Sequence, residues 1–204
     1  MAIGPDSGFY NALSLATDIV VVNALTILTS LPLVTVGASL RAANVVIAQL
    51  IAEEGSRPTR TYLNQFRREW KTSTLWSLIL TVIGVLALYE FWIIGQAEIV
   101  PTVAFMLRAG IFSGLIVLGG ISFWFFYFEA HRPRAFKETF TAAALSAIRY
   151  LPRTLVGVAL IVAPLAFVVI APSRWVVVLF YFLVIGIAFS IYLFQLAARG
   201  TLSR

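Results

Sequence analysis

Residues 175–198 read WVVVLFYFLVIGIAFSIYLFQLAA, a run of mostly apolar and aromatic residues without a charged side chain. A helix needs about 20 such residues to cross the hydrocarbon core of a bilayer. The run therefore predicts a spanning helix over 174–198. Three further apolar runs predict spanning helices over 72–95, 103–128 and 154–171. We expect an all-α integral membrane protein.

The first apolar region, residues 11–54, is broken near Pro32 and Gly37. Proline removes a backbone donor, and glycine permits a tight turn. A hairpin of helices over 11–31 and 38–54 gives six crossings with both termini inside. One kinked helix instead gives five crossings with the N-terminus outside. An unbroken helix of this length would reach about 60 Å, twice the hydrocarbon thickness, which favours the hairpin.

Composition agrees with a membrane domain. The 204 residues are 60% hydrophobic and 12% charged, whereas a soluble domain carries about 25% charged residues. The segments between the apolar runs are too short for a large soluble domain. We therefore expect a single transmembrane domain over residues 1–204.

The basic residues lie mainly in alternate loops. Of the 15 Lys and Arg residues, five lie in 57–71 and five in 132–153, whereas the loop 95–102 holds Glu98 and no cation. This pattern predicts that the basic loops and the C-terminus face the cytoplasm. The net charge of +6 is thus explained by topology. We expect the lipid bilayer, and no nucleic acid, as a partner.

Both basic loops have amphipathic character. Tyr62, Phe66 and Trp70 recur every four residues beside Arg67, and helical spacing extends from Phe136 and Phe140. The spacing predicts short cytoplasmic helices over 59–71 and 133–151 with aromatic residues toward the membrane. The candidate contacts with lipid headgroups or a soluble partner are Tyr62, Phe66, Arg67, Trp70, Phe136 and Phe140.

Polar residues within the spans are a second group of candidates, because charge in lipid is costly and often functional. At matching depths, Glu90 and Arg108 are expected to form an ion pair near the outer face. Arg41 would join them in the hairpin arrangement, which also brings two asparagines to one depth. Such residues either lock helices together or serve transport. The candidates are Asp18, Asn23, Arg41, Asn44, Glu90 and Arg108.

Small residues recur in the span 103–128. Gly110 and Gly114 form a GxxxG pattern, and Gly119 and Gly120 follow. Such residues let helix backbones approach closely in lipid. They predict either close packing within the subunit or the seam of a homo-oligomer.

Signals of catalysis are absent from the sequence. It holds no HExxH, GxSxG, P-loop or GxGxxG motif and no cysteine. The single histidine, His131, stands beside Glu129, whereas a metal site generally takes three or four protein ligands. We expect no catalytic residues, no cofactor and no bound metal.

Three stretches carry a family resemblance. Ser30-Leu-Pro-Leu-Val-Thr-Val-Gly-Ala-Ser39, Glu53-Glu-Gly55 and Phe66-Arg-Arg-Glu-Trp70 resemble the YesL family of bacterial membrane proteins. Ala147-Ile-Arg-Tyr-Leu-Pro-Arg-Thr-Leu155 is similar to the second cytoplasmic stretch of that family. The resemblance extends over nearly the whole chain.

The resemblance implies location in the bacterial cytoplasmic membrane and an accessory role. YesL proteins are often encoded beside carbohydrate ABC transporters, so permease subunits are the expected partners. The family supplies no catalytic residues to carry over. The alternative is a small secondary transporter or channel that uses the broken first region, because discontinuous helices often build sites at the membrane midplane.

Overall fold

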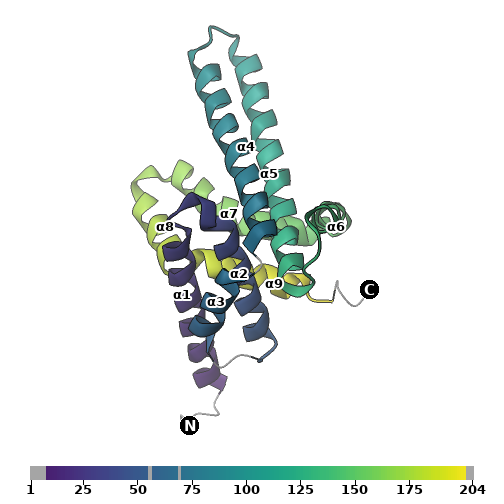
Figure 1. Ribbon diagram of the computed structural model, residues 1–204. Helices are drawn as coiled ribbons and strands as arrows, with labels where there is room; N and C mark the ends of the chain where they lie inside the picture. The colour runs from purple at the N-terminus through teal and green to yellow at the C-terminus, as the bar shows by residue number, and fades with distance from the viewer. Residues whose placement is uncertain (1–7, 55–56, 69, 201–204) are drawn as a thin grey trace.

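The computed structural model describes residues 8–54, 57–68 and 70–200, and within these ranges the chain is helical, with no β-strand. Six helical segments are long and apolar enough to cross a membrane, which confirms the expected all-α membrane bundle. Figure 1 shows the hairpins α1–α2 and α4–α5 offset along the molecule, with the C-terminal helices beside their junction.

The first hairpin consists of α1 (Gly8–Ser30) and α2 (Val36–Ile51), which pack against each other. The two-helix prediction for residues 11–54 is therefore confirmed, and the single kinked helix is wrong. The helices are joined by a short 3-10 helix, η1 (Leu33–Thr35). The Thr35 hydroxyl oxygen lies 2.6 Å from the carbonyl oxygen of Thr29 and 2.7 Å from that of Pro32, so it closes the turn.

Gly37 does not make the turn that the sequence predicts. It lies in the first turn of α2, where a Cβ atom would collide with the backbone carbonyl of Ser73. Its lack of a side chain therefore lets α2 approach the beginning of α4. This contact sets the tip of the first hairpin against the base of the second.

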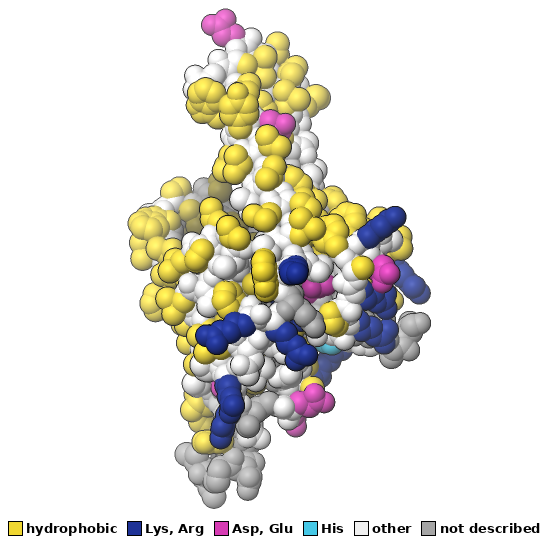
Figure 2. Space-filling model, viewed as in Figure 1, with side chains coloured by type: hydrophobic (Ala, Val, Ile, Leu, Met, Phe, Trp, Pro, Cys, Tyr) yellow, Lys and Arg dark blue, Asp and Glu magenta, His cyan; other side chains and the backbone are white. Residues whose placement is uncertain are grey.

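The second hairpin consists of α4 (Trp70–Gln96) and α5 (Pro101–His131). At 1.5 Å per residue, the two helices are about 40 and 46 Å long. Their connected ends extend beyond the other helices (Figure 1). Figure 2 shows this protruding part covered by hydrophobic side chains, with the basic side chains of the visible face gathered below it.

The remaining elements differ in detail from the predicted ranges. The stretch 59–71 divides, because α3 (Pro58–Arg67) ends where Arg68 adopts an extended backbone, and Trp70 begins α4. The second amphipathic helix is α6 (Phe136–Arg149), followed by α7 (Leu151–Ile170). The last span follows the 3-10 turn η2 (Pro172–Arg174) and has three parts, α8 (Trp175–Tyr181), the π-helix η3 (Phe182–Gly186) and α9 (Ile187–Ala198).

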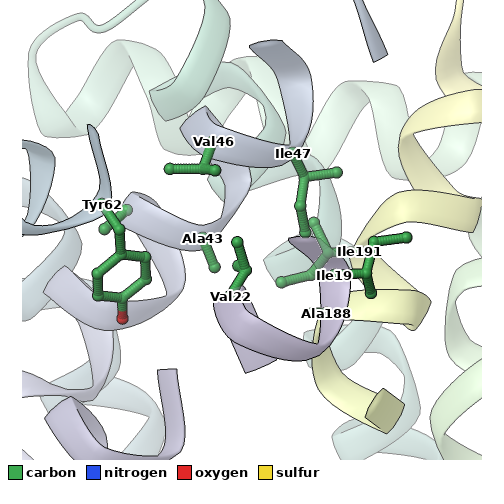
Figure 3. Packing of buried hydrophobic residues seen from close by; sticks show 9 residues of the cluster. Ile19, Val22, Ala43, Val46, Ile47, Tyr62, Ala188 and Ile191 are labelled. Carbon is green, nitrogen blue, oxygen red and sulfur yellow. The ribbon is translucent and has the colours of Figure 1, made fainter. Parts of the chain in front are cut away.

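Two hydrophobic clusters hold the helices together. The first joins α1, α2, α3 and α9, and Figure 3 shows Val22 of α1 beside Ala43 of α2 and Ile19 of α1 beside Ile191 of α9. The second joins α4, α5, α6 and α9 around Trp76, Trp124 and Phe125. Within lipid, such contacts gain stability from van der Waals packing rather than from exclusion of water.

The amphipathic helices α3 and α6 direct their aromatic residues into these clusters. Tyr62 is 0% exposed, and Phe66 packs against the first cluster. The ring centroids of Phe136 and Phe140 lie 6.4 and 5.4 Å from that of Trp76. Because it is fully buried, Tyr62 cannot contact lipid or a partner. Phe66, Phe136 and Phe140 are half-buried, and their contact with lipid or a partner stays a prediction.

The glycines of α5 fall into two groups. A Cβ at Gly120 would lie 2.6 Å from the Thr154 Cγ2 atom, so this glycine permits close packing of α5 and α7. A Cβ at Gly110, Gly114 or Gly119 would meet no described atom within 4 Å outside its immediate helical surroundings. Close packing within the subunit is therefore wrong for the GxxxG pair.

Candidate functional site

Arg41 and Glu129 form a buried ion pair at the junction of the two hairpins. The Arg41 Nε and Glu129 Oε2 atoms are 3.9 Å apart, and the side chains are 4% and 2% exposed. Ser73 and Thr139 donate hydrogen bonds to the two carboxylate oxygens of Glu129, at 3.2 and 3.3 Å. The Arg41 guanidinium also donates to the carbonyl oxygen of Arg68 at 3.1 Å. The pair thus connects α2, α4, α5, α6 and the end of α3.

The position of Arg41 corrects the sequence prediction, which placed it with Glu90 and Arg108 near the outer face. That prediction aligned the two hairpins at one depth, whereas Gly37 sets the tip of one against the base of the other. Glu129 was missed as a partner because the predicted span ended at residue 128, whereas α5 continues to His131. Phe125 and Phe126 lie one helical turn before Glu129 and are buried, which indicates that the buried face of α5 continues to Glu129.

Glu90 and Arg108 do not form the predicted ion pair. The Glu90 side chain is exposed, and the guanidinium carbon of Arg108 lies 6.0 Å from the ring centroid of Phe91. Phe91 follows Glu90 in the sequence, so its side chain points about 100° away from that of Glu90 around the helix. This direction brings Phe91 toward α5, where Arg108 makes a cation–π contact with it in place of the ion pair.

Asn23 completes the hydrogen bonding of the π-helix η3. Its side-chain amide nitrogen donates to the carbonyl oxygens of Phe182 and Leu183, at 3.0 and 2.9 Å. Its oxygen accepts from the backbone nitrogen of Ala188 at 3.0 Å. The side chain is fully buried, so its polar atoms satisfy backbone groups that the wider π-helical turn would otherwise leave without partners.

Asn44 binds a different part of the C-terminal segment. The Gln195 side-chain nitrogen donates to the backbone oxygen of Asn44 at 2.8 Å and to its side-chain oxygen at 3.2 Å. The Asn44 amide nitrogen donates to the carbonyl oxygen of Leu40 at 2.9 Å. The two asparagines therefore do not pair as expected from their predicted depths, and each joins its own hairpin helix to the C-terminal segment.

Asp18 lies beside the core residue Ile19 on α1, and its side chain is half-buried. Among the described residues, no cation lies within ion-pairing distance of its carboxylate. Asp18 thus differs from Arg41, Asn23 and Asn44, whose polar atoms join one helix to another.

A hydroxyl cluster lies between α1, α2 and α3. The Tyr62 hydroxyl oxygen is 2.7 Å from that of Thr29 and donates to the carbonyl oxygen of Ser39 at 3.3 Å. Thr29 also donates to the Ser39 hydroxyl at 2.9 Å. Burial raises the pKa of the Tyr62 phenol above its ordinary value of 10.0. The sequence pattern drew attention to the tyrosine, but not to the two hydroxyl residues that hold it.

A basic pocket opens beside the buried ion pair. Its volume is about 540 Å³, and it lies between the end of α3, the start of α4 and the segment after α5. Arg67 and Trp70 are exposed there, and their contact with lipid headgroups or a soluble partner stays a prediction. Such a basic pocket suits an anionic group such as a lipid headgroup. The basic pocket is lined by Arg67, Trp70, Lys71, Thr72, Glu129, Pro133 and Arg134.

Six long apolar helices, polar side chains bonded inside the bundle and basic residues gathered below the protruding hairpin define a polytopic all-α membrane protein. Among the described residues, no group of three His, Asp or Glu side chains could hold a metal ion. Residues 19–91 match the model of a protein family described as "Protein of unknown function, DUF624". The finer resemblance to the YesL family stays a prediction. No curated protein and no solved structure matches the chain.

Proposed function

We propose that the protein is a non-enzymatic multi-pass subunit of the bacterial cytoplasmic membrane that assembles with the permease of a carbohydrate ABC transport system. The resemblance of the Ser30–Ser39 motif to the YesL family supports the carbohydrate assignment. The surface of the α4–α5 hairpin supports assembly with another membrane protein, and it is the observation on which the proposal depends.

The protruding part of this hairpin has large apolar side chains without cover. Leu88 is 73% exposed, Phe105 72% and Met106 65%. On α5, small residues form a ridge at helical spacing, and all of them are exposed. We call this ridge the glycine stripe, and its residues are Gly110, Ser113 and Gly114, with the exposed Val117 next on the same helix face.

The glycine stripe suits a partner helix better than lipid alone. Small residues let a second backbone come close, which increases van der Waals contact where the hydrophobic effect gives no advantage. Space for this approach exists, because a Cβ at Gly110 or Gly114 would meet nothing within 4 Å. A permease helix is the proposed occupant, and a second copy of this chain is the alternative occupant.

Co-purification tests the proposal. The tagged full chain is extracted from the membranes of its bacterial host in a mild detergent, and bound proteins are identified by mass spectrometry. Carbohydrate permease subunits are expected with the wild type and should be lost in Gly110→Leu and Gly114→Leu. Gly119→Leu is the matched control, since nine residues place Gly119 about half a turn from Gly110 around the helix.

Three outcomes would overturn the proposal. One is recovery of the wild type without a permease, and another is equal recovery of the permease with all three leucine variants. The third is a complex of two copies of this chain that the stripe variants dissociate, which would assign the stripe to a homo-oligomer.

The alternative function, a small transporter or channel, has less support from the broken first region. Both asparagines of that region use their side-chain amides in bonds within the protein. Solute uptake into proteoliposomes that is lost in Asp18→Asn would favour this alternative, because Asp18 has no ion-pair partner among the described residues.

A further inference from the structure

A second feature of α5 lies on the side opposite the glycine stripe. Here α2, α4, α5, α7 and α9 enclose an apolar groove with a volume of about 630 Å³. Its floor includes Phe126 and Ile191, which are 5% exposed, whereas Phe112 and Leu165 at its rim are 56% and 51% exposed. The groove therefore opens to the exterior between α5 and α7, and its walls belong to helices that can span a membrane.

The polar side chains in the groove are engaged within the protein. Ser122 donates to the carbonyl oxygen of Leu118 at 2.7 Å, and its hydroxyl oxygen also accepts from Trp76. Ser190 donates to the carbonyl oxygen of Gly186 at 2.7 Å. Asn44 is bonded to α2 and α9, as described above. The lining holds no charged residue, so an occupant needs no polar group in its buried part.

The position of the groove distinguishes between apolar occupants. The groove opens between α5 and α7, within segments that can span a membrane, so the hydrocarbon chains of the bilayer reach it directly. A linear hydrocarbon chain is much thinner than a helix and can follow the seam between α5 and α7. An unfilled groove would leave its lining atoms without van der Waals partners on one side.

We propose that this groove is a binding site for one acyl chain of a bilayer phospholipid. The chain inserts between α5 and α7, with its methylene groups against Phe123, Val158 and Ile161. Contact with five helices at once makes this chain a long-lived component of the fold, in contrast to the lipid that surrounds the α4–α5 hairpin. The proposal is independent of the permease.

Gly119 provides a specific way to fill the groove. It is one of the lining residues, and a Cβ added there would meet no other atom within 4 Å. A larger side chain at this position can therefore enter the groove without displacing the backbone. The same substitution at Gly114 points away from the groove and serves as the matched control.

The test uses the full chain reconstituted in phosphatidylcholine bilayers that contain a phosphatidylcholine with a diazirine at the end of one acyl chain. After irradiation, labelled residues are mapped by peptide mass spectrometry. In the wild type, labelling of Phe123 and Ile161 is expected to exceed that of Leu88 and Phe105 severalfold. Gly119→Phe should abolish this excess, Gly119→Ala should reduce it less, and Gly114→Phe should preserve it.

The proposal fails if the groove is labelled no more strongly than the hairpin, or if Gly119→Phe, folded as judged by its helix content and gel-filtration profile, leaves the excess unchanged. A diazirine amino acid in place of Val162, at the groove rim, identifies any other occupant by mass. An adduct of lipid size supports the proposal. An adduct with a second copy or another protein overturns it.

Discussion

The burial of Arg41 and Glu129 means that neither charge can be removed alone without leaving the other in a medium of low dielectric constant. Glu129 also accepts hydrogen bonds from Ser73 and Thr139, so its carboxylate orders α4 and α6 as well as α2. The pair therefore fixes the relative positions of these helices, which the hydrophobic pattern alone does not determine.

Removal of one partner should destabilise the protein strongly. For Glu129→Met or Arg41→Met, we expect the free energy of unfolding to fall by about 3–5 kcal/mol, the usual cost of an unpaired buried charge. The double variant, which leaves no unpaired charge, should recover part of this loss. Thermal unfolding in detergent, followed by tryptophan fluorescence, measures each variant. Losses that simply add in the double variant would show that the two charges do not interact.

Tyr62 should make stability sensitive to alkaline pH. Its pKa is raised by burial above the ordinary value of 10.0, so the folded chain keeps the phenol proton after the unfolded chain has lost it. The stabilising effect is complete below about pH 10 and is lost as the pH rises through the folded-state pKa. Tyr62→Phe should lower stability near neutral pH by about 0.5–1.5 kcal/mol through the lost hydrogen bond.

The expected signature of Tyr62 is therefore a smaller fall in unfolding temperature above pH 10 for Tyr62→Phe than for the wild type. Tyr89→Phe is the control, since Tyr89 is 57% exposed on α4. An equal alkaline loss in Tyr62→Phe and the wild type would exclude Tyr62 as its source.

At the scale of helices, Gly37 decides how the two hairpins meet. We expect Gly37→Ala to destabilise the protein by about 1–3 kcal/mol, since extra atoms in a packed contact force shifts of the backbone. Gly84→Ala is the matched control, because its Cβ would meet nothing within 4 Å and alanine favours helix. The difference between their unfolding temperatures measures the effect. Equal stability of the two variants would mean that α2 and α4 do not approach closely.

Hydropathy was sufficient to predict the helices, because a spanning segment must satisfy all its backbone hydrogen bonds internally. The break at Pro32 was correctly placed, whereas the role of Gly37 was not, since its constraint comes from Ser73, far along the chain. The π-helix η3 was also beyond prediction. It depends on Asn23, whose bonds to Phe182 and Leu183 span more than half of the sequence.

At the scale of the whole molecule, the relative depth of the hairpins could not be read from the sequence. A hydropathy profile gives the length of each span, but two hairpins can slide past each other without changing it. The depth is set by the contact of Gly37 with Ser73 and by the Arg41–Glu129 pair. This is why Glu90 and Arg108 were expected to be joined by Arg41, and why the hairpin α4–α5 protrudes.

The charge pattern predicts that the base of the α4–α5 hairpin faces the cytoplasm and its tip faces outward. The chain has no cysteine, so single cysteines can report each side. Arg60 on α3, Lys137 on α6 and Glu98 at the tip are exposed and suit this purpose. In intact spheroplasts, a membrane-impermeant maleimide should label Glu98→Cys, whereas Arg60→Cys and Lys137→Cys should react only after lysis. The reverse pattern would invert the topology, and labelling of all three only after lysis would mean that the hairpin does not cross the membrane.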